Sequence, residues 1–235
     1  MKVSVVVPVF NEEENVPRLA KEFAELVGRL DGLEVVLVDD GSKDGTWAKI
    51  QEAAKMFPFL RGVRSTNNRG QSAAMLLGLN EARGEILVTM DGDLQNNPAD
   101  IPQLVAKVGP FDVVCGFRAK RKDTWSKRVA SKIGNAIRNS ATKDGLRDTG
   151  CSLKAFKREC LADLPALNGT HRFMGAYFRL NGRSIEQIPV DHRFRQFGVS
   201  KYTNLKRLPK TAFDLIGFLW YRSRVLKPAE RIERS

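Results

Sequence analysis

The sequence predicts an α/β protein with a mostly parallel, Rossmann-like sheet flanked by helices on both faces. Two observations support this fold class. Short runs rich in β-branched residues alternate with helical patterns through the first half of the chain. The first of these runs, residues 3–9, is apolar almost throughout, which is typical of a strand covered on both faces. Such alternation implies right-handed crossovers between parallel strands.

Five strands and three helices are expected before residue 117. The strands are predicted at residues 3–9, 34–38, 62–65, 85–90 and 112–116. Asn11 can cap the first helix, and Glu12–Glu14 would lie where the helix dipole favours negative charge. The stretches DGTWAKIQEAAKMF and QSAAMLLGLNEAR predict the second and third helices.

The pattern changes after residue 117. A basic loop, RAKRKDTWSKR, leads into a helix predicted at about residues 124–142. Two shorter elements are expected around LKAFKRECLADL and RFMGAYFRLNG, followed by a strand at residues 184–190. A basic, loop-like segment, RFRQFGVSKYTNLKR, precedes a last amphipathic stretch, KTAFDLIGFLWYRSR. No internal repeat or low-complexity linker divides the chain, so a single domain over residues 1–235 is expected.

The composition is that of a globular protein with an anionic partner. The 235 residues are 42% hydrophobic and 28% charged, which argues against disorder. The net charge of +12 points to nucleic acid, a phosphorylated substrate or an anionic membrane face. The three cysteines, Cys115, Cys151 and Cys160, have no metal-ligand spacing, so reduced thiols in the cytoplasm are expected. No signal-peptide pattern opens the chain and no apolar run reaches roughly 18 residues, so we expect no membrane crossing by this chain itself.

Polar residues follow four successive predicted strands. Ligands of an open parallel sheet bind outside the carboxyl ends of its strands, so these exits should converge on one edge. Each exit has a purely structural explanation: an Asx turn, helix-dipole decoration or a tight turn. Three unrelated turns that happen to place carboxylates on one rim of the same sheet are a poorer explanation than a single binding site. The exits are PVFNE (8–12), DDGSKDGT (39–46), TNNRG (66–70) and DGDLQ (91–95).

The exit at residues 91–95 predicts a divalent cation. Carboxylates crowded on one edge repel each other unless a cation joins them. Oxygen ligands with few protein contacts suit Mg²⁺ or Mn²⁺, which share a substrate's phosphates. Asp91 and Asp93, with Gln95 nearby, are therefore the predicted metal residues, and the cation would bridge a diphosphate.

These ordered motifs closely resemble those of family-2 glycosyltransferases with the GT-A fold, which use a nucleotide-diphosphate sugar. The resemblance covers nearly the whole chain. It implies that Asp91 meets the nucleotide-sugar and that Asp93 and Gln95 hold the metal. No Walker-type loop or GxGxxG is present, which argues against an NTPase or a dehydrogenase. The other residues implied to bind the nucleotide-sugar in this half are Pro8, Phe10, Glu12, Asp39 and Asp40.

The second half resembles the polyprenyl-phosphate glycosyltransferases, the group of dolichyl-phosphate mannose synthase. The motifs that carry this resemblance are RVASKIGN, DTGCSL and RQFGVSKY. It implies inverting transfer of one sugar to a lipid-linked phosphate, which is already anionic and needs no general base. Arg118, Arg128 and Ser131 are then candidates for the acceptor phosphate, and Arg195 and Lys201 for the donor diphosphate. Any single one of these cations could instead be a solvated surface charge. His171, in THRF, could be structural or lie near the acceptor, and the sequence does not assign it.

The resemblance also implies different roles for three parts of the chain. Residues 1–117 would bind the nucleotide-sugar and residues 118–208 would face the acceptor. Residues 209–227 would form an amphipathic helix at the cytoplasmic membrane face, with Trp220 and Tyr221 at the headgroup boundary. The alternative for this helix is packing on the core. Anchoring by a partner membrane protein stays open beside peripheral binding.

Three other functions are alternatives to this one. A family-2 transferase could act on a saccharide or another hydroxyl acceptor. A basic nucleic-acid-binding protein would account for the charge, but the carboxylate-rich rim would repel a phosphate backbone. A sugar-nucleotide sensor without turnover would require damaged motifs, and none is damaged. The donor base, UDP or GDP, stays open; DTGCSL and RQFGVSKY favour a UDP-sugar and undecaprenyl phosphate.

Overall fold

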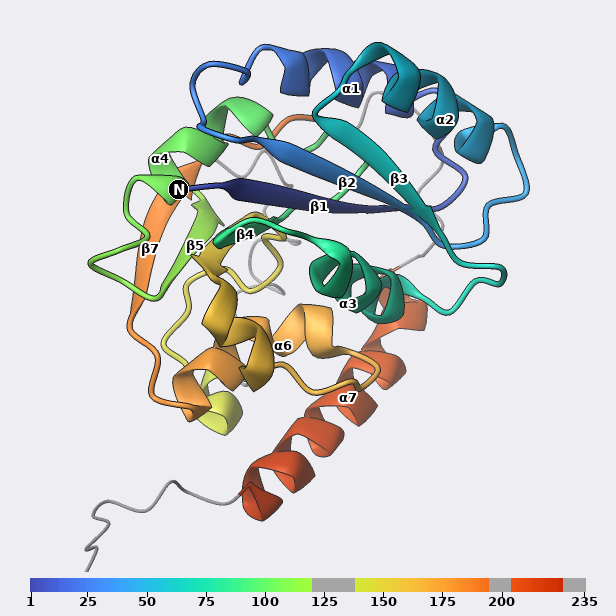
Figure 1. Cartoon of the computed structure of the whole chain (residues 1–235). Coiled ribbons are helices and arrows are strands. Elements are labelled where there is room, and N and C mark those ends of the chain that lie inside the picture. Colours follow the sequence, from blue (N-terminus) through green and yellow to red (C-terminus); the bar gives the residue numbers. More distant parts are fainter. Residues whose placement is uncertain (120–137, 195–203, 226–235) are drawn as a thin grey trace, which may run out of the picture.

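The structure, a computed structural model, describes residues 1–119, 138–194 and 204–225. Its described strands form one seven-stranded sheet in the order β3-β2-β1-β4-β6-β5-β7 (Figure 1). Neighbouring strands are parallel except where β6 pairs antiparallel with both β4 and β5. The strands are β1 (Val3–Val9), β2 (Glu34–Asp39), β3 (Leu60–Arg64), β4 (Ile86–Thr89), β5 (Val113–Arg118), β6 (Lys154–Lys157) and β7 (Ile185–Val190).

Helices cover both faces of the sheet, as predicted. On one face, α1 (Val16–Ala24), α2 (Thr46–Met56) and α4 (Ile101–Val105) share a core with alternate residues of β1. On the other face, α3 (Gln71–Glu81), α6 (Thr170–Leu180) and α7 (Asn204–Arg224) form a second core (Figure 1). Two 3-10 helices, η1 (Pro98–Asp100) and η2 (Arg158–Asp163), complete the described elements.

Two expected elements differ from the structure. The first helix begins at Val16 rather than after Asn11, with Asn15 at its N-cap position and a proline in its first turn. Asn11 instead adopts a left-handed conformation, with φ of 52°, at the exit of β1. The segment LKAFKRECLADL is not a single element, because β6 is inserted between β4 and β5 before η2 begins.

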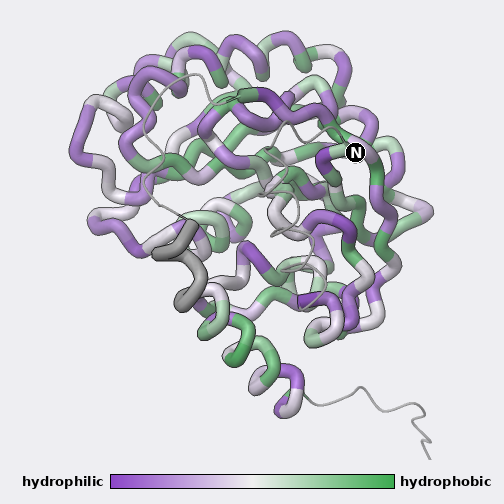
Figure 2. Tube along the Cα trace, turned by 180° about the vertical axis from the view of Figure 1, so that it is seen from behind, coloured by the Kyte–Doolittle hydropathy of each residue, from purple (hydrophilic) through white to green (hydrophobic). Residues whose placement is uncertain are grey.

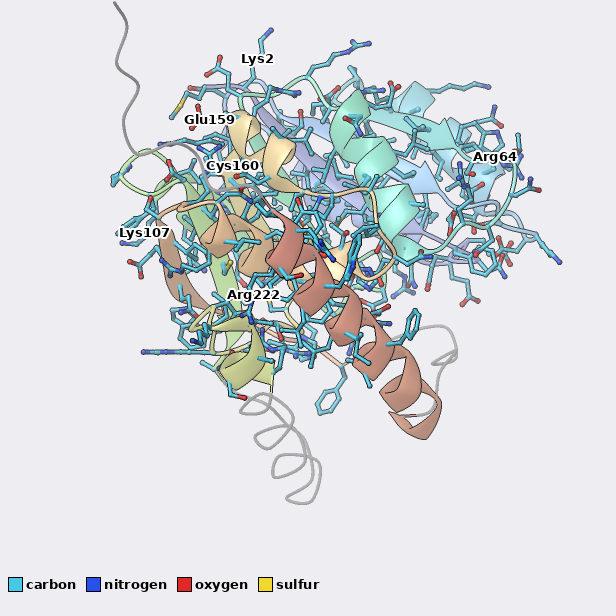
Figure 3. The ribbon with its side chains drawn as sticks, turned by 90° about the horizontal axis from the view of Figure 1, so that it is seen from below. Lys2, Arg64, Lys107, Glu159, Cys160 and Arg222 are labelled. Carbon is cyan, nitrogen blue, oxygen red and sulfur yellow. The ribbon has the colours of Figure 1, made fainter. Side chains whose placement is uncertain are left out.

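Helix α7 has both a packed and an exposed apolar face. On the packed face Phe218 is 1% exposed, and its ring lies 5.5 Å from that of Phe173 and 5.2 Å from that of Tyr177. Arg222 points from α7 to the segment at 138–142, where Nη1 donates to the carbonyl of Ala141 at 2.6 Å (Figure 3). The helix extends away from the sheet, with apolar residues along its exposed length (Figure 2). The exposed apolar side chains on it are Phe213, Ile216 and Trp220.

Asp112, next to the start of β5, links this strand to the end of β6 and to the residue before β7. One carboxylate oxygen accepts a hydrogen bond from Lys157 Nζ at 2.8 Å, and the other accepts from the backbone N and Oγ of Ser184 at 3.0 and 2.8 Å. The hydrogen bond from Lys157, followed by those from Ser184, holds the pKa of the Asp112 carboxyl well below its usual range. The carboxylate therefore favours the folded state wherever the unfolded chain would also be ionised.

We expect Asp112→Asn to lower the free energy of unfolding at pH 7 by about 1–3 kcal/mol, because an amide nitrogen replaces one acceptor oxygen. A carboxyl whose pKa is depressed in the folded state stabilises that state at pH values above its unfolded-state pKa, which is near 4. This stabilisation is lost as the pH falls below that value. The gap in melting temperature between wild type and variant should therefore narrow progressively as the pH falls below about 5, through pH 3 and on toward the depressed pKa of the folded state. A gap that stays constant over this range would contradict the assignment.

Candidate active site

The exits of the central strands lie side by side. Val9 at the end of β1 pairs with Asp39 at the end of β2, and Val6 pairs with Thr89 at the end of β4. Gly92 brings the loop after β4 against the end of β1, because an added Cβ would lie 2.5 Å from Val9 Cγ1 and 3.1 Å from the carbonyl oxygen of residue 8. The three exits thus meet at one edge, as predicted from the sequence.

The loop that follows β4 has a tightly defined shape. Leu94 is 2% exposed and has a φ of 61°, a conformation that costs a non-glycine residue energy and needs support from its surroundings. Asp93 Oδ1 accepts a hydrogen bond from the backbone N of Gln95 at 3.2 Å, which forms an Asx turn. Asp93 and Gln95 therefore share one turn, directly after Asp91.

The Asp91 carboxylate is strongly affected by its surroundings. Its Oδ1 accepts a hydrogen bond from Gln71 Nε2, at the first residue of α3, at 2.7 Å. Burial, followed by the charge of Asp93, raises the pKa of Asp91 to about 6. The hydroxyl of Ser152 and the cations Lys154 and Arg118 oppose this rise. Two carboxylates are thus held close together in a partly buried setting.

The residues present fit Mg²⁺ or Mn²⁺. A cation would relieve the repulsion between Asp91 and Asp93 and offset the cost of burying the charge of Asp91. In the described part of the chain, no group of three or more His, Cys, Asp and Glu side chains could hold a metal by itself. Mg²⁺ needs few protein ligands when it also binds a substrate's phosphates, so the two carboxylates would be enough; metal binding by Asp91, Asp93 and Gln95 stays a prediction.

Asp39 and Asp40 arrange the neighbouring loops. Asp39 Oδ1 accepts from the backbone N of Ser42 at 2.9 Å, and its Oδ2 lies 3.0 Å from Arg64 Nε. Asp40 accepts from the backbone N of residues 69 and 70 at 2.9 and 2.8 Å. Both carboxylates are buried, so they hold the rim of the predicted nucleotide site together. Whether either contacts a nucleotide stays a prediction.

The exit of β1 carries the other predicted nucleotide residues. Pro8, Phe10 and Glu12 are half-buried there. The backbone N of Glu12 donates to Thr46 Oγ1 at 2.8 Å, and its carboxylate accepts from Asn15 Nδ2 at 2.5 Å. A cavity of about 260 Å³ opens beside this segment, lined by Asn11 to Asn15 and Asp44. The three residues lie at the same sheet edge as Asp91, and their contact with a base or ribose stays a prediction.

Arg118, at the end of β5, is held by a bidentate ion pair. Its Nε lies 2.6 Å from Asp148 Oδ2 and its Nη2 lies 2.9 Å from Asp148 Oδ1. The Arg118 side chain is 17% exposed, and its charge acts on Asp91. Gly150 leaves room for it, since an added Cβ would lie 2.7 Å from Nη2. The structure therefore brings Arg118 to the site with a fixed orientation.

Four predicted residues lie outside the described residues: Arg128, Ser131, Arg195 and Lys201. The chain just before Arg195 is anchored to the loop at residues 91–96, which follows β4 and is called the acidic loop below. The backbone N of Arg193 donates to the carbonyl of Gln95 at 2.8 Å, and Asn96 forms a β-bridge with His192. The basic segment therefore starts next to the candidate metal residues.

Sequence reasoning missed the residues that support the site. Gln71 and Ser152 bind Asp91, Asp148 orients Arg118, and Lys154 lies buried beneath the acidic loop. In the sequence, the string DTGCSL, which contains Asp148 and Ser152, indicates only a family resemblance. His171, which had no assigned role, places Nδ1 2.6 Å from Ser72 Oγ and joins the first turns of α6 and α3.

Solved structures share the fold. The chain aligns with glucosyl-3-phosphoglycerate synthase from Mycobacterium tuberculosis with a TM-score of 0.70 and 20% identity, covering 97% of this chain and 81% of that one. It aligns with mannosyltransferase PcManGT from Pyrobaculum calidifontis, in complex with GDP-Man and Mn²⁺, with a TM-score of 0.71 and 23% identity, covering 97% and 66%. The fold is therefore that of the GT-A glycosyltransferases.

The profile described as glycosyl transferase family 2 matches residues 4–164, so the chain belongs to this family. Two relatives named undecaprenyl-phosphate 4-deoxy-4-formamido-L-arabinose transferase are each 37% identical over 92% of this chain. They come from Enterobacter sp. (strain 638) and Proteus mirabilis (strain HI4320). The chain spans only 66% and 67% of their lengths.

Proposed function

We propose that the chain transfers a single sugar, with inversion, from a nucleotide-diphosphate sugar to a polyprenyl phosphate. The observation that carries this proposal is the 37% identity to undecaprenyl-phosphate sugar transferases over 92% of the chain. The site supports it, since paired carboxylates face the strand exits and an oriented arginine lies beside them. The sugar named for those relatives is the first donor sugar to test.

Asp91, Asp93 and Gln95 would hold Mg²⁺ or Mn²⁺, which supplies charge neutralisation of the leaving diphosphate when bound. The Asp39 and Asp40 loops, with Pro8, Phe10 and Glu12, would bind the base and ribose. Gln71 fixes the orientation of the Asp91 carboxylate through the 2.7 Å hydrogen bond. Preorganised groups of this kind need little rearrangement as charge develops.

The acceptor phosphate would attack without a general base, because it is ionised at neutral pH. One of its oxygens forms a bond to the anomeric carbon while the bond from that carbon to the diphosphate breaks. The nucleoside diphosphate leaves with the electron pair, and attack from the opposite side inverts the configuration. Arg118, with Arg128 and Ser131, would bind the acceptor phosphate, and Arg195 and Lys201 would bind the donor diphosphate.

The test is transfer of radiolabelled sugar from UDP- and GDP-linked donors to undecaprenyl phosphate in detergent micelles with Mn²⁺. The expected result is label in the organic phase only when the lipid phosphate is present. A parallel reaction contains soluble saccharides as the alternative acceptor. Label that enters saccharide, with none in the lipid, would overturn the proposed acceptor.

We also propose that the outer face of α7 lies on the membrane that carries the acceptor. Phe213, Ile216 and Trp220 are 75%, 63% and 61% exposed and are spaced three and four residues apart on one helix face. Arg224 follows in the last turn, where it could meet anionic headgroups. The proposed contact is with the membrane surface, and none of the described helices is long and apolar enough to cross a bilayer.

Replacing Phe213 and Trp220 together by Ser should weaken binding to anionic vesicles at least tenfold, since each buried aromatic contributes about 1.5–3 kcal/mol. Co-sedimentation with vesicles of phosphatidylglycerol and phosphatidylcholine measures this. The matched control is Met56→Ser, which removes a side chain that is 70% exposed at the end of α2. Equal vesicle binding by all three proteins would contradict a membrane role for this face.

A further inference from the structure

We infer that Ser152 is a positioning residue that holds the acidic loop in the shape needed to bind the metal–diphosphate. This inference rests on the proposed function, because it assigns a supporting residue to the same site. Ser152 comes from the segment between the Asp148 turn and β6, 61 positions after Asp91. It is half-buried and contacts both ends of the acidic loop.

The Ser152 hydroxyl has a complete set of hydrogen bonds. A hydroxyl offers one donor and accepts at two lone pairs. Its oxygen accepts from the backbone N of Asp91 at 3.1 Å and from Asn96 Nδ2 at 2.8 Å. Its own hydrogen is then available to the Asp91 carboxylate, with which the hydroxyl interacts. A single side chain thus binds the first residue of the loop twice and the residue after Gln95 once.

Hydrogen bonds to two backbone carbonyls hold the segment that carries Ser152. Its carbonyl oxygen accepts a hydrogen bond from Thr89 Oγ1 at 2.8 Å, which ties it to the end of β4. The carbonyl of the preceding residue, Cys151, accepts a hydrogen bond from the buried Lys154 Nζ. Hydrogen bonds therefore fix the segment that carries the Ser152 hydroxyl. The buried Lys154 adds a positive charge that acts on Asp91.

The loop needs such a support because its backbone is strained between the two anchor points. Leu94 holds a φ of 61° with a buried side chain, and Asn96 is 4% exposed. Without the hydroxyl, the Asp91 backbone N and the Asn96 amide both lose an acceptor in a partly buried setting. The strained turn that places Asp93 and Gln95 would then lose the contact that joins its two ends.

The experiment measures Mn²⁺ binding by the intact protein with UDP as the probe, from the electron paramagnetic resonance signal of free Mn²⁺. The variants are Ser152→Ala, Ser152→Thr and Ser184→Ala. Loss of a residue that orients metal ligands weakens metal affinity about 10–100-fold. We expect that loss in Ser152→Ala and recovery to within a few-fold of wild type in Ser152→Thr, which keeps the hydroxyl.

Ser184→Ala is the matched control, because it removes a hydroxyl that bonds Asp112 at the opposite end of β5 from Arg118 and leaves the loop and its support unchanged. It should lower the melting temperature, while its Mn²⁺ affinity stays that of wild type. Equal Mn²⁺ affinity in Ser152→Ala and wild type would overturn the inference alone. Equal weakening in Ser184→Ala and Ser152→Ala would also overturn it, since loss of stability would then explain both. Wild type that binds no Mn²⁺ with UDP would overturn the proposed function itself.

Discussion

Asp93→Asn is expected to abolish the part of the thermal stabilisation by a nucleotide-sugar that depends on Mn²⁺. It should also reduce kcat/KM about 10³-fold, which corresponds to roughly 4 kcal/mol of lost transition-state stabilisation. Asn keeps a side-chain oxygen that can accept from the backbone N of Gln95, so the turn between these residues survives. What the variant loses is the negative charge that attracts the cation.

The measurement is a thermal-shift panel of UDP- and GDP-sugars with and without Mn²⁺, because a ligand that binds only the native state raises the melting temperature. The matched control is Asp31→Asn, an exposed residue in the turn before β2 and thus at the opposite end of the sheet. It removes the same charge and should leave the shift unchanged. A full Mn²⁺-dependent shift in Asp93→Asn would remove Asp93 from the metal site.

The fold class and the sheet edge that carries the site could be predicted from local pattern. Buried parallel strands are near-continuous apolar runs, and the polar exits that follow them are read directly from the sequence. Register then follows from the topology, so Asp39 and Asp91 meet at one edge. The antiparallel strand β6 could not be found in this way, because four residues within a mixed segment carry too little periodicity.

The supporting contacts of the site were beyond sequence reasoning for a different reason. Asp91 binds Gln71, 20 positions away, and Ser152, 61 positions away. Arg118 pairs with Asp148, 30 positions away. Hydrophobic periodicity reports which face of an element is buried but not which distant loop folds over it. Such long-range polar pairs become visible only when the tertiary structure is known.

The amphipathic helix shows a further limit of the sequence pattern. From the sequence alone, packing on the core and lying on a membrane are alternatives for residues 209–227. The structure shows that one face of α7 packs through Phe218, while Phe213 and Trp220 remain exposed on another. The two explanations are therefore compatible, because 3.6 residues per turn allow one helix to present two apolar stripes.

Arg118→Lys is expected to raise the KM for polyprenyl phosphate about a hundredfold, or roughly 3 kcal/mol, with the donor KM nearly unchanged. Lys keeps the positive charge but lacks the planar fork that binds Asp148 through two nitrogens. A point charge on a flexible stem cannot keep the same orientation toward a phosphate. Substitution by Ala is less informative, because it would leave the buried Asp148 without its partner and destabilise the fold.

Asp148→Asn tests the same arrangement from the other side. It should also raise the acceptor KM, by about tenfold, because Arg118 then loses one strong hydrogen bond that orients it. If the two residues act as one unit, the double variant should be less impaired than the product of the single effects. The matched control is Arg183→Lys. In the wild type, Arg183 Nε lies 2.7 Å from Asp163 Oδ2. This pair is distant from the site, so the variant should change stability only. A rise in the donor KM with an unchanged acceptor KM would place Arg118 on the donor side instead.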